Sequence, residues 1–147
     1  MTDGPAETLT AYRWTRPFPT RWHDNDVFGH VNNAVYYSAM DTTVTSWLLG
    51  EAGFGMHEDG EMAFVIASSC RYFAAGAFPD TLVVGLRADR IGTTSVAWGL
   101  GIFREADRAL LATGTFVHVF VGRDDRRPVP VPAPLRSRIE RELVAEA

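Results

Sequence analysis

Basic residues, cysteines and long apolar runs are all scarce in this sequence, and each shortage excludes a class of protein. The 14 Lys and Arg residues are outnumbered by 18 Asp and Glu residues. This balance argues against nucleic acid as a partner, because phosphate binding needs a basic face. The single cysteine, Cys70, leaves no internal disulfide and fits a reducing compartment. No apolar run approaches the roughly 20 residues that a membrane helix needs.

What is present describes an ordinary globular chain. Its 147 residues are 46% apolar and 22% charged, which predicts a single domain over residues 1–147. Residues 1–8 have neither the basic nor the apolar part of a signal peptide, so we expect a cytoplasmic protein with no membrane partner. Cys70 lies in an apolar run, where packing is favoured over a nucleophilic role. The four histidines show no metal-ligand spacing, so no metal is expected: His23, His30, His57 and His118.

The polar stretch 21–33 holds the densest cluster of reactive side chains. Gly29 allows a sharp turn, and Asn32 and Asn33 are both good N-cap residues for a helix that starts there. The start of a helix carries unpaired N–H groups and a partial positive charge, which suit a carbonyl oxygen or an oxyanion. Asp26 therefore stands just before an electrophilic pocket. This combination can polarise a carbonyl group and attack it.

A long helix is predicted from Asn33 to about Leu49. Its apolar residues are spaced by three and four: Tyr36, Met40, Val44, Trp47 and Leu48. The Thr and Ser residues at 42, 43, 45 and 46 are poor helix formers, so packing against something large must hold the helix. Gly50 is the expected C-terminal glycine. Three further glycines predict a loop after it: Gly53, Gly55 and Gly60.

Five strands are predicted around this helix. The first covers Leu9 to Trp22, and Pro17 and Pro19 place it at a sheet edge or interrupt it. Four more follow the helix in a row, separated by turn signals and by the polar hairpin loop 105–108: Ala63 to Phe73, Thr81 to Ile91, Thr94 to Phe103, and Ala109 to Val121. A short charged helix, Leu135 to Ala147, follows an extended connector at 129–134. This order predicts an α+β fold, an antiparallel sheet of about five strands with one long helix.

Two of these strands indicate how the sheet is covered. In the strand from Thr94 the bulky residues 96, 98, 100 and 102 alternate with the small residues 95, 97, 99 and 101. Small residues let a helix lie close to a sheet, and the bulky face then needs cover as well. The strand Ala109 to Val121 is largely apolar on both faces. One helix does not cover both faces, so a second subunit is expected.

The loop resembles the signature of the hotdog-fold thioesterases, in the 4-hydroxybenzoyl-CoA thioesterase-like family. The residues that carry the resemblance are Asp24-x-Asp26-x-x-Gly29-His30-Val31-Asn32-Asn33, with Tyr36-Tyr37 behind them. Weaker likenesses follow at Arg71-Tyr72, Gly92-Thr93-Thr94-Ser95 and Arg127-Pro128-Val129-Pro130. The resemblance implies a sheet wrapped around the helix, a homodimer or homotetramer, and hydrolysis of an acyl-CoA or acyl-carrier-protein thioester. Coenzyme A is then part of the substrate, and no cofactor is implied.

The resemblance also implies roles for the loop residues. Asp26 takes the position of the family's catalytic Asp, although a carboxylate there also suits the helix dipole. Asn33 stands where relatives place a residue beside the water or thioester, a role compatible with capping. His30 resembles part of the Asp, Asn and His set of plant acyl-carrier-protein thioesterases, and a structural role is equally open. Asp24 is favoured as structural. Asp41 matches another hotdog branch, whose catalytic acid lies within the helix.

Substrate-binding residues follow from the same resemblance. The acyl tunnel is expected between the helix and the strands of a partner, and the loop glycine is counted with its lining: Phe28, Gly29, Tyr36, Tyr37, Met40 and Phe64. Arg90 and the turn 123–127 are candidates for the phosphates of coenzyme A. Thr94 and Ser95 are candidates for pantetheine.

Two rival functions stay open at this point. A hotdog enoyl-CoA hydratase uses an Asp and a His on one loop, as Asp26 and His30 could, but its pattern has proline where this chain has Gly29. A non-catalytic acyl-CoA-binding protein is the other rival. Release of free thiol separates hydrolysis from both.

Overall fold

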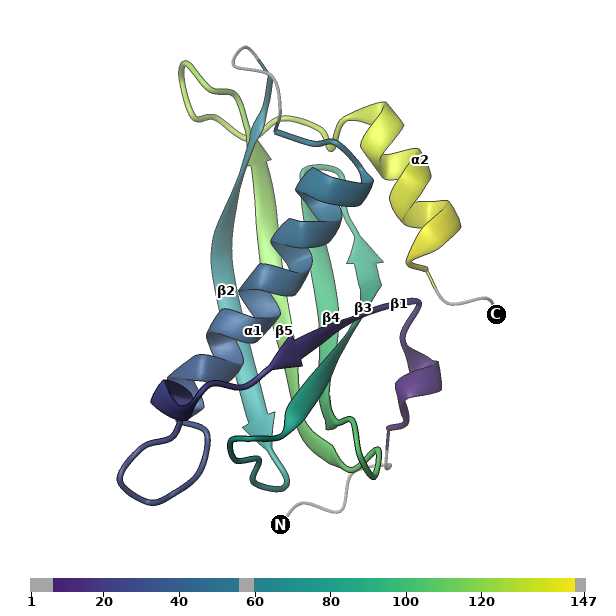
Figure 1. Cartoon of the computed structure of the whole chain (residues 1–147). Helices are drawn as coiled ribbons and strands as arrows, with labels where there is room; N and C mark the ends of the chain where they lie inside the picture. The colour runs from purple at the N-terminus through teal and green to yellow at the C-terminus, as the bar shows by residue number, and fades with distance from the viewer. Residues whose placement is uncertain (1–6, 56–59, 145–147) are drawn as a thin grey trace.

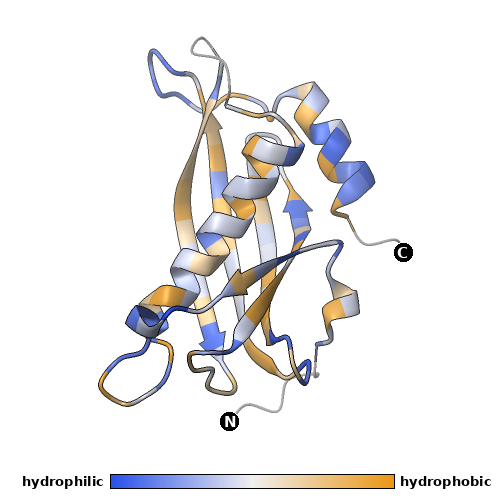
Figure 2. Cartoon of the chain, in the orientation of Figure 1, coloured by the Kyte–Doolittle hydropathy of each residue, from blue (hydrophilic) through white to orange (hydrophobic). Residues whose placement is uncertain are grey.

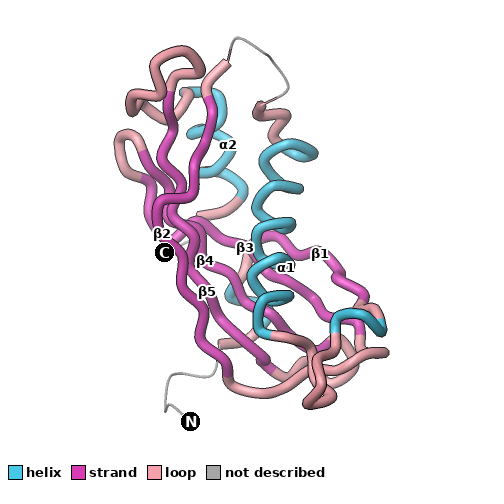
Figure 3. The backbone as a smooth tube through the Cα atoms, turned by 90° about the vertical axis from the view of Figure 1, so that its left-hand side faces the viewer, coloured by secondary structure: helices cyan, strands magenta, loops and turns pink. Residues whose placement is uncertain are grey.

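One long helix lies across a curved, five-stranded antiparallel sheet. The computed structural model describes residues 7–55 and 60–144. Helix α1 (Asn33–Ser46) packs on one face of the sheet, which curves around it in Figure 3. The strand order is β1-β3-β4-β5-β2. This is the α+β hotdog arrangement expected from the sequence, and that prediction is confirmed.

The four strands after the helix match their predicted bounds to within a residue. They are β2 (Met62–Tyr72), β3 (Thr81–Ile91), β4 (Ser95–Arg104) and β5 (Leu110–Val121). The first strand was predicted too long. β1 covers only Trp14–Pro19, between 3₁₀ turns at Leu9–Ala11 and Trp22–Asp24. Its edge position, predicted from Pro17 and Pro19, is confirmed.

The apolar stripe of α1 forms the centre of the core, as its spacing predicted. All five of its residues are buried: Tyr36, Met40, Val44, Trp47 and Leu48. The helix continues into a π-helical turn, Trp47–Glu51. Gly50 does not end it, so that prediction was wrong. Gly53 does, with φ of +67°, and the N–H of Phe54 then bonds the Leu48 carbonyl.

The prediction that the small residues of β4 lie under the helix was wrong. The bulky residues Val96, Trp98, Leu100 and Ile102 face α1 and are buried. The small face lies under Tyr12 instead. A Cβ atom at Gly101 would stand 2.5 Å from the Tyr12 ring. The helix approaches the sheet closely at Gly114 of β5, where a Cβ would stand 2.3 Å from Sδ of Met40.

The two edges of the sheet differ in how they meet solvent. β1 is short and carries two prolines, which lack the N–H that a further strand would need. β2 has eleven residues and no proline. It also exposes large apolar side chains, and its apolar colour is visible in Figure 2: Phe64, Val65, Ile66 and Tyr72. β2 is therefore the edge that is open to another strand.

Helix α2 (Ala133–Glu142) covers the end of the sheet near the C-terminal end of α1 (Figure 1). Leu135 and Ile139 pack into the core, and Arg138 bonds both Glu142 and the carbonyl of Glu51. The predicted C-terminal helix is thus present and begins two residues earlier. Its last three predicted residues lie outside the described ranges. Within those ranges no helix is both long and apolar enough to cross a membrane.

Candidate active site

The residues between β1 and α1 form a small hairpin loop with Asp26 at its base. Asn25 and Val31 make an antiparallel bridge, and the Asp26 N–H donates to the His30 carbonyl at 3.0 Å. Gly29 turns the tip with φ of +83°, as its position predicted. Beside the loop lies an open cleft of about 830 Å³, whose lining includes Asp26, Phe28 and Gly29.

Two donors orient the carboxylate of Asp26. The N–H of Phe28 donates to Oδ1 at 2.9 Å, and Nδ2 of Asn32 donates to Oδ2 at 3.2 Å. The Oδ1 atom of Asn32 also accepts from the Ala34 N–H at 2.9 Å. Asn32 therefore caps α1 and holds Asp26 with the same amide group. It is the link between the carboxylate and the helix start.

Asn33 is not an N-cap residue, contrary to one of its predicted roles. It is the first residue of α1, and its side chain is exposed. Asn32 already satisfies two of the N–H groups in the first turn, those of Ala34 and Val35. Within the described residues, the N–H of Asn33 has no partner. The helix start thus offers one free donor next to Asp26 rather than the several expected.

Asp24 has a structural role. It is buried, and it accepts from both the main-chain N–H and the guanidinium of Arg21, at 2.8 and 2.9 Å. Burial acts to raise the pKa of the carboxyl, but the bonds from Arg21 outweigh it and hold that pKa below its usual value. The Asp24 carbonyl accepts from the Asn32 N–H at 2.9 Å. Asp24 therefore positions Asn32, the residue that holds Asp26.

The segment 73–80 lies beside the loop and is joined to it by hydrogen bonds. The Gly76 carbonyl accepts from the Val31 N–H at 2.8 Å, and the Gly76 N–H donates to the Tyr36 hydroxyl at 3.2 Å. Oδ1 of Asn25 accepts from the Phe78 N–H at 3.0 Å. Tyr36 is therefore the core residue that holds the segment 73–80 in place beside the loop.

The other expected tunnel residues near this end of α1 differ in burial. Met40 is fully buried, whereas Tyr37 is half-buried and Phe28 is 81% exposed at the loop tip.

The end of β2 reaches the start of α1. The Tyr72 hydroxyl donates to the Asn33 carbonyl at 3.2 Å, and the Tyr72 ring packs edge-on against Tyr36. Burial raises the pKa of the Cys70 thiol beside it. A thiol with a raised pKa is a weak nucleophile, which agrees with the packing role expected of Cys70.

His30 is exposed, and its main-chain carbonyl accepts from the Asp26 N–H. No side-chain hydrogen bond between His30 and Asp26 is present among the described residues.

Several predicted site residues lie at the other end of the molecule. Arg90, Thr94 and Ser95 flank the turn between β3 and β4, which lies beside the C-terminal end of α1 in Figure 1. Phe64 is near the start of β2, at that same end. Asp41 is exposed on the middle of α1. A single chain therefore does not bring these residues to the Asp26 loop.

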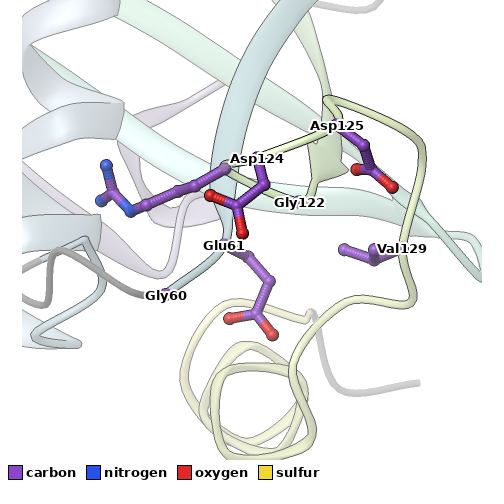
Figure 4. Close-up of a pocket in the computed structure, with 7 residues that line it drawn as sticks. Gly60, Glu61, Gly122, Asp124, Asp125 and Val129 are labelled. Carbon is purple, nitrogen blue, oxygen red and sulfur yellow. The ribbon is translucent and has the colours of Figure 1, made fainter.

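The turn 123–127 lies at this far end too. A cavity of about 510 Å³ beside it is lined by Glu61, Arg123, Asp124 and Asp125 (Figure 4). Three carboxylates and one guanidinium give this cavity an acidic character, which does not suit phosphate groups. Arg126 and Arg127 are not part of its lining. The described residues contain no cluster of three potential metal ligands.

Sequence reasoning missed two kinds of residue. Asn32 was read mainly as a cap, although an amide has a donor for the carboxylate as well as an acceptor for the helix. Trp22 and Val27, both largely exposed, line the cleft with Asp26. The sequence did contain a signal for Trp22 and Val27, because a large aromatic and a branched apolar residue are unusual in an otherwise polar loop.

Comparisons with known proteins place the chain in a family. The model of the thioesterase superfamily matches residues 28–111, more than half of the chain. The PA5185 protein from Pseudomonas aeruginosa PAO1 is 40% identical, with a TM-score of 0.89 over 97% of this chain and 100% of that one. A candidate acyl-CoA thioesterase from Xanthomonas campestris is 30% identical, with a TM-score of 0.72 over 82% and 99%.

A more distant structure shares the fold. Slr0204 from Synechocystis, a 1,4-dihydroxy-2-naphthoyl-CoA thioesterase, is 20% identical, with a TM-score of 0.78 over 85% of this chain and 93% of that one. The comparison with curated proteins finds no match. The family model and the 40% identical structure cover enough of the chain to be decisive. The chain belongs to the thioesterase superfamily and is a thioester hydrolase.

Proposed function

We propose that the protein hydrolyses an acyl-CoA thioester with Asp26 as the catalytic carboxylate. The observation that carries this is the pairing of a fixed carboxylate with one free helix N–H, through Asn32. The thioester oxygen would accept from the Asn33 N–H, a donor of the kind whose loss costs about 3–4 kcal/mol of transition-state stabilisation. Asp26 would then activate water as a general base or attack as a nucleophile. Thiolate leaves readily, so no further acid is required.

A second copy of the chain would complete the site. The open edge β2 carries unpaired main-chain groups and exposed apolar side chains along its length. Pairing of two such edges about a two-fold axis is isologous and antiparallel. It would place the Met62 end of one β2 beside the Tyr72 end of the other. The far-end residues of one copy, including Phe64, would then face the Asp26 loop of its partner.

Thiol release from a panel of acyl-CoA and acyl-carrier-protein thioesters tests this function. Asp26→Asn should lower kcat by about 10²–10⁴-fold, because it keeps the shape of the side chain and removes the base. Acyl-CoA binding should be largely unchanged. After a single turnover in ¹⁸O-labelled water, label in the Asp26 carboxylate would demonstrate attack by Asp26, since a general base leaves all of the label in the released acid.

Two matched variants complete the test. Asp41→Asn should have little effect, and a large loss there with a small loss in Asp26→Asn would transfer the role to the helix carboxylate. Glu140→Gln is the neutral control, because this exposed residue lies on α2 and lines neither the Asp26 cleft nor the two far-end cavities. Turnover of Asp26→Asn within a few-fold of the parent would refute the assignment.

A further inference from the structure

His118 is a buried polar residue with a fixed orientation. It lies on the helix side of β5 and is 6% exposed. Its Nδ1 atom accepts from Nε1–H of Trp98 at 2.8 Å. Trp98 is fully buried and packs against Trp47 of α1, with ring centroids 6.1 Å apart. A buried indole N–H needs an acceptor, so this bond holds the imidazole ring in place.

The bond also determines where the imidazole proton lies. Burial lowers the pKa of His118 and outweighs the opposing effect of Asp41, so the ring is neutral near pH 7. A neutral imidazole whose Nδ1 accepts a hydrogen bond carries its proton on Nε2. The Nε2–H bond points from the opposite side of the ring, away from Trp98. His118 is therefore a directed hydrogen-bond donor.

A cavity of about 230 Å³ lies beside His118, at the C-terminal end of α1. Thr45, Gly55 and Glu61 are part of its lining, and half of the lining residues are apolar: Leu48, Leu49, Phe54, Met62 and Ala63. Arg123 also lines it, and Nε of Arg123 is the one side-chain polar atom that is buried without a partner among the described residues. His118 lines the same cavity, and among the described residues its Nε2 atom has no hydrogen-bond partner. The cavity thus combines apolar walls with the imidazole donor of His118 and with the charged residues Glu61 and Arg123.

We propose that this cavity binds the distal part of the acyl group and selects acyl chains that carry a hydroxyl or carbonyl oxygen. The inference rests on the proposed function, because antiparallel pairing of β2 would bring this cavity toward the Asp26 loop of the partner. An apolar pocket with a few directed polar groups fixes both the shape and the orientation of its ligand. A plain hydrocarbon chain would fill the apolar walls but leave the His118 donor unpaired, which is costly once that donor is removed from water.

The test compares pairs of acyl-CoA thioesters that have the same chain length and differ only in one hydroxyl or keto group. The oxygen position is varied along the chain, and kcat/KM is measured for both members of each pair. The parent enzyme should prefer the oxygenated member of its best pair by about 10-fold or more. His118→Phe should abolish that preference, because it keeps an aromatic ring and removes the donor. His118→Gln should retain part of it.

Trp98→Phe is the control for positioning. It leaves His118 in place but removes the bond that fixes the ring, so the preference should fall between those of the parent and His118→Phe. Each result is a ratio within one enzyme, so a general loss of stability cancels. A merely structural His118 would lower both rates equally and leave the ratio unchanged. That result, or a parent enzyme with no preference at any position, would overturn the proposal.

A second measurement separates this proposal from the proposed function. Proton–nitrogen NMR of the histidine rings should show the Nε2–H form of His118, and its signal should shift when a free hydroxy acid binds but not when the unsubstituted acid is added. A shift without any thioester turnover would refute acyl-CoA hydrolysis and support the cavity. Turnover with no shift and no preference would do the reverse.

Discussion

The two ends of α1 present different chemistry. At the N-terminal end, the Asp26 carboxylate stands in an open cleft and is held by Asn32 and a main-chain N–H. At the C-terminal end, His118 is buried, held by Trp98, and lines a cavity of apolar side chains together with Glu61 and Arg123. The first arrangement suits a group that must exchange protons with water. The second suits recognition of a ligand group that is desolvated when it binds.

Under the proposed function, neither end is a complete thioesterase site within one chain. The cleft beside Asp26 measures about 830 Å³ and contains a carboxylate that two hydrogen bonds hold. The cavity beside His118 measures about 230 Å³, and its one carboxylate, Glu61, has no hydrogen bond among the described residues. An antiparallel pair of β2 edges would join one end of each kind, twice per dimer. The proposed function therefore divides the work between the two copies.

Disruption of the β2 edge should separate the two ends. Ile66 is 62% exposed on β2, and Ile66→Lys would bring two like charges together at a two-fold contact. We expect a monomer near 16.2 kDa in sedimentation and a loss of activity on the order of 100-fold, because substrate positioning is lost. Thr15→Lys, on the exposed edge β1, should change neither quantity. A fully active monomer would contradict a site between subunits.

Subunit mixing should restore activity to a pair of defective variants. Asp26→Asn disables one end, and Ala63→Trp should fill the cavity at the other. Random exchange makes half of the dimers mixed, and each mixed dimer has one intact site, so about a quarter of the parent activity should return. Thiol release after mixing measures this. No recovery would place both residues in one site of the same chain, and full activity of Ala63→Trp alone would remove the far end from the site.

The sequence was informative where a local signal determines structure. The bounds of β3 were predicted without error because turn residues flank it, and the stripe of α1 followed from spacing alone. The small residues of β4 were assigned to the wrong face because the alternation is symmetrical. The sequence does not show that Tyr12, which is far from β4 along the chain, covers Gly85 and Gly101; this contact is seen only in the folded structure.

The candidate site divides in the same way. Asp26 and the helix start were found because loop, carboxylate and cap are adjacent in the chain. His118 was passed over because a lone histidine in an apolar strand reads as core, and its bond to Trp98 joins diagonal neighbours on two strands. Thr94, Ser95 and Arg90 were grouped with Asp26 by family resemblance. These three residues lie at the other end of the chain, so the proposed function brings them to Asp26 through a second copy, as the expected acyl tunnel did.

A charge at the start of α1 should affect turnover more than stability. Asn33 is exposed and is not the cap, and an acidic residue in the first turn favours the helix. Asn33→Asp should therefore melt near the parent temperature. Its turnover should fall by about tenfold or more, because a second carboxylate raises the pKa of its neighbour and repels the developing oxyanion. Asn33→Ser should fall between the two.

The matched control for Asn33 is the true cap. Asn32→Ala should lose about 1 kcal/mol of folding stability as well as activity, since it removes both the cap and the bond to Asp26. Thermal melting and thiol release measured on the same samples separate the two positions. Unchanged turnover in Asn33→Asp would mean that the Asn33 position does not meet the substrate.

The smallest expected effect concerns the pH dependence of stability at the His118 end. Burial lowers the pKa of His118 in the folded state below the ordinary value of 6.5, while Asp41 on α1 opposes the shift and Glu61 and Arg123 line the same cavity. As the pH falls below 6.5, the unfolded chain takes up the proton first, so stability that is present above this pH is lost below it. One such group contributes a slope of at most about 1.4 kcal/mol per pH unit. Urea unfolding from pH 7.5 to 5 should show a shallower slope for His118→Phe than for the parent. Equal slopes for the parent and His118→Phe would mean that the buried imidazole titrates as freely as one in the unfolded chain.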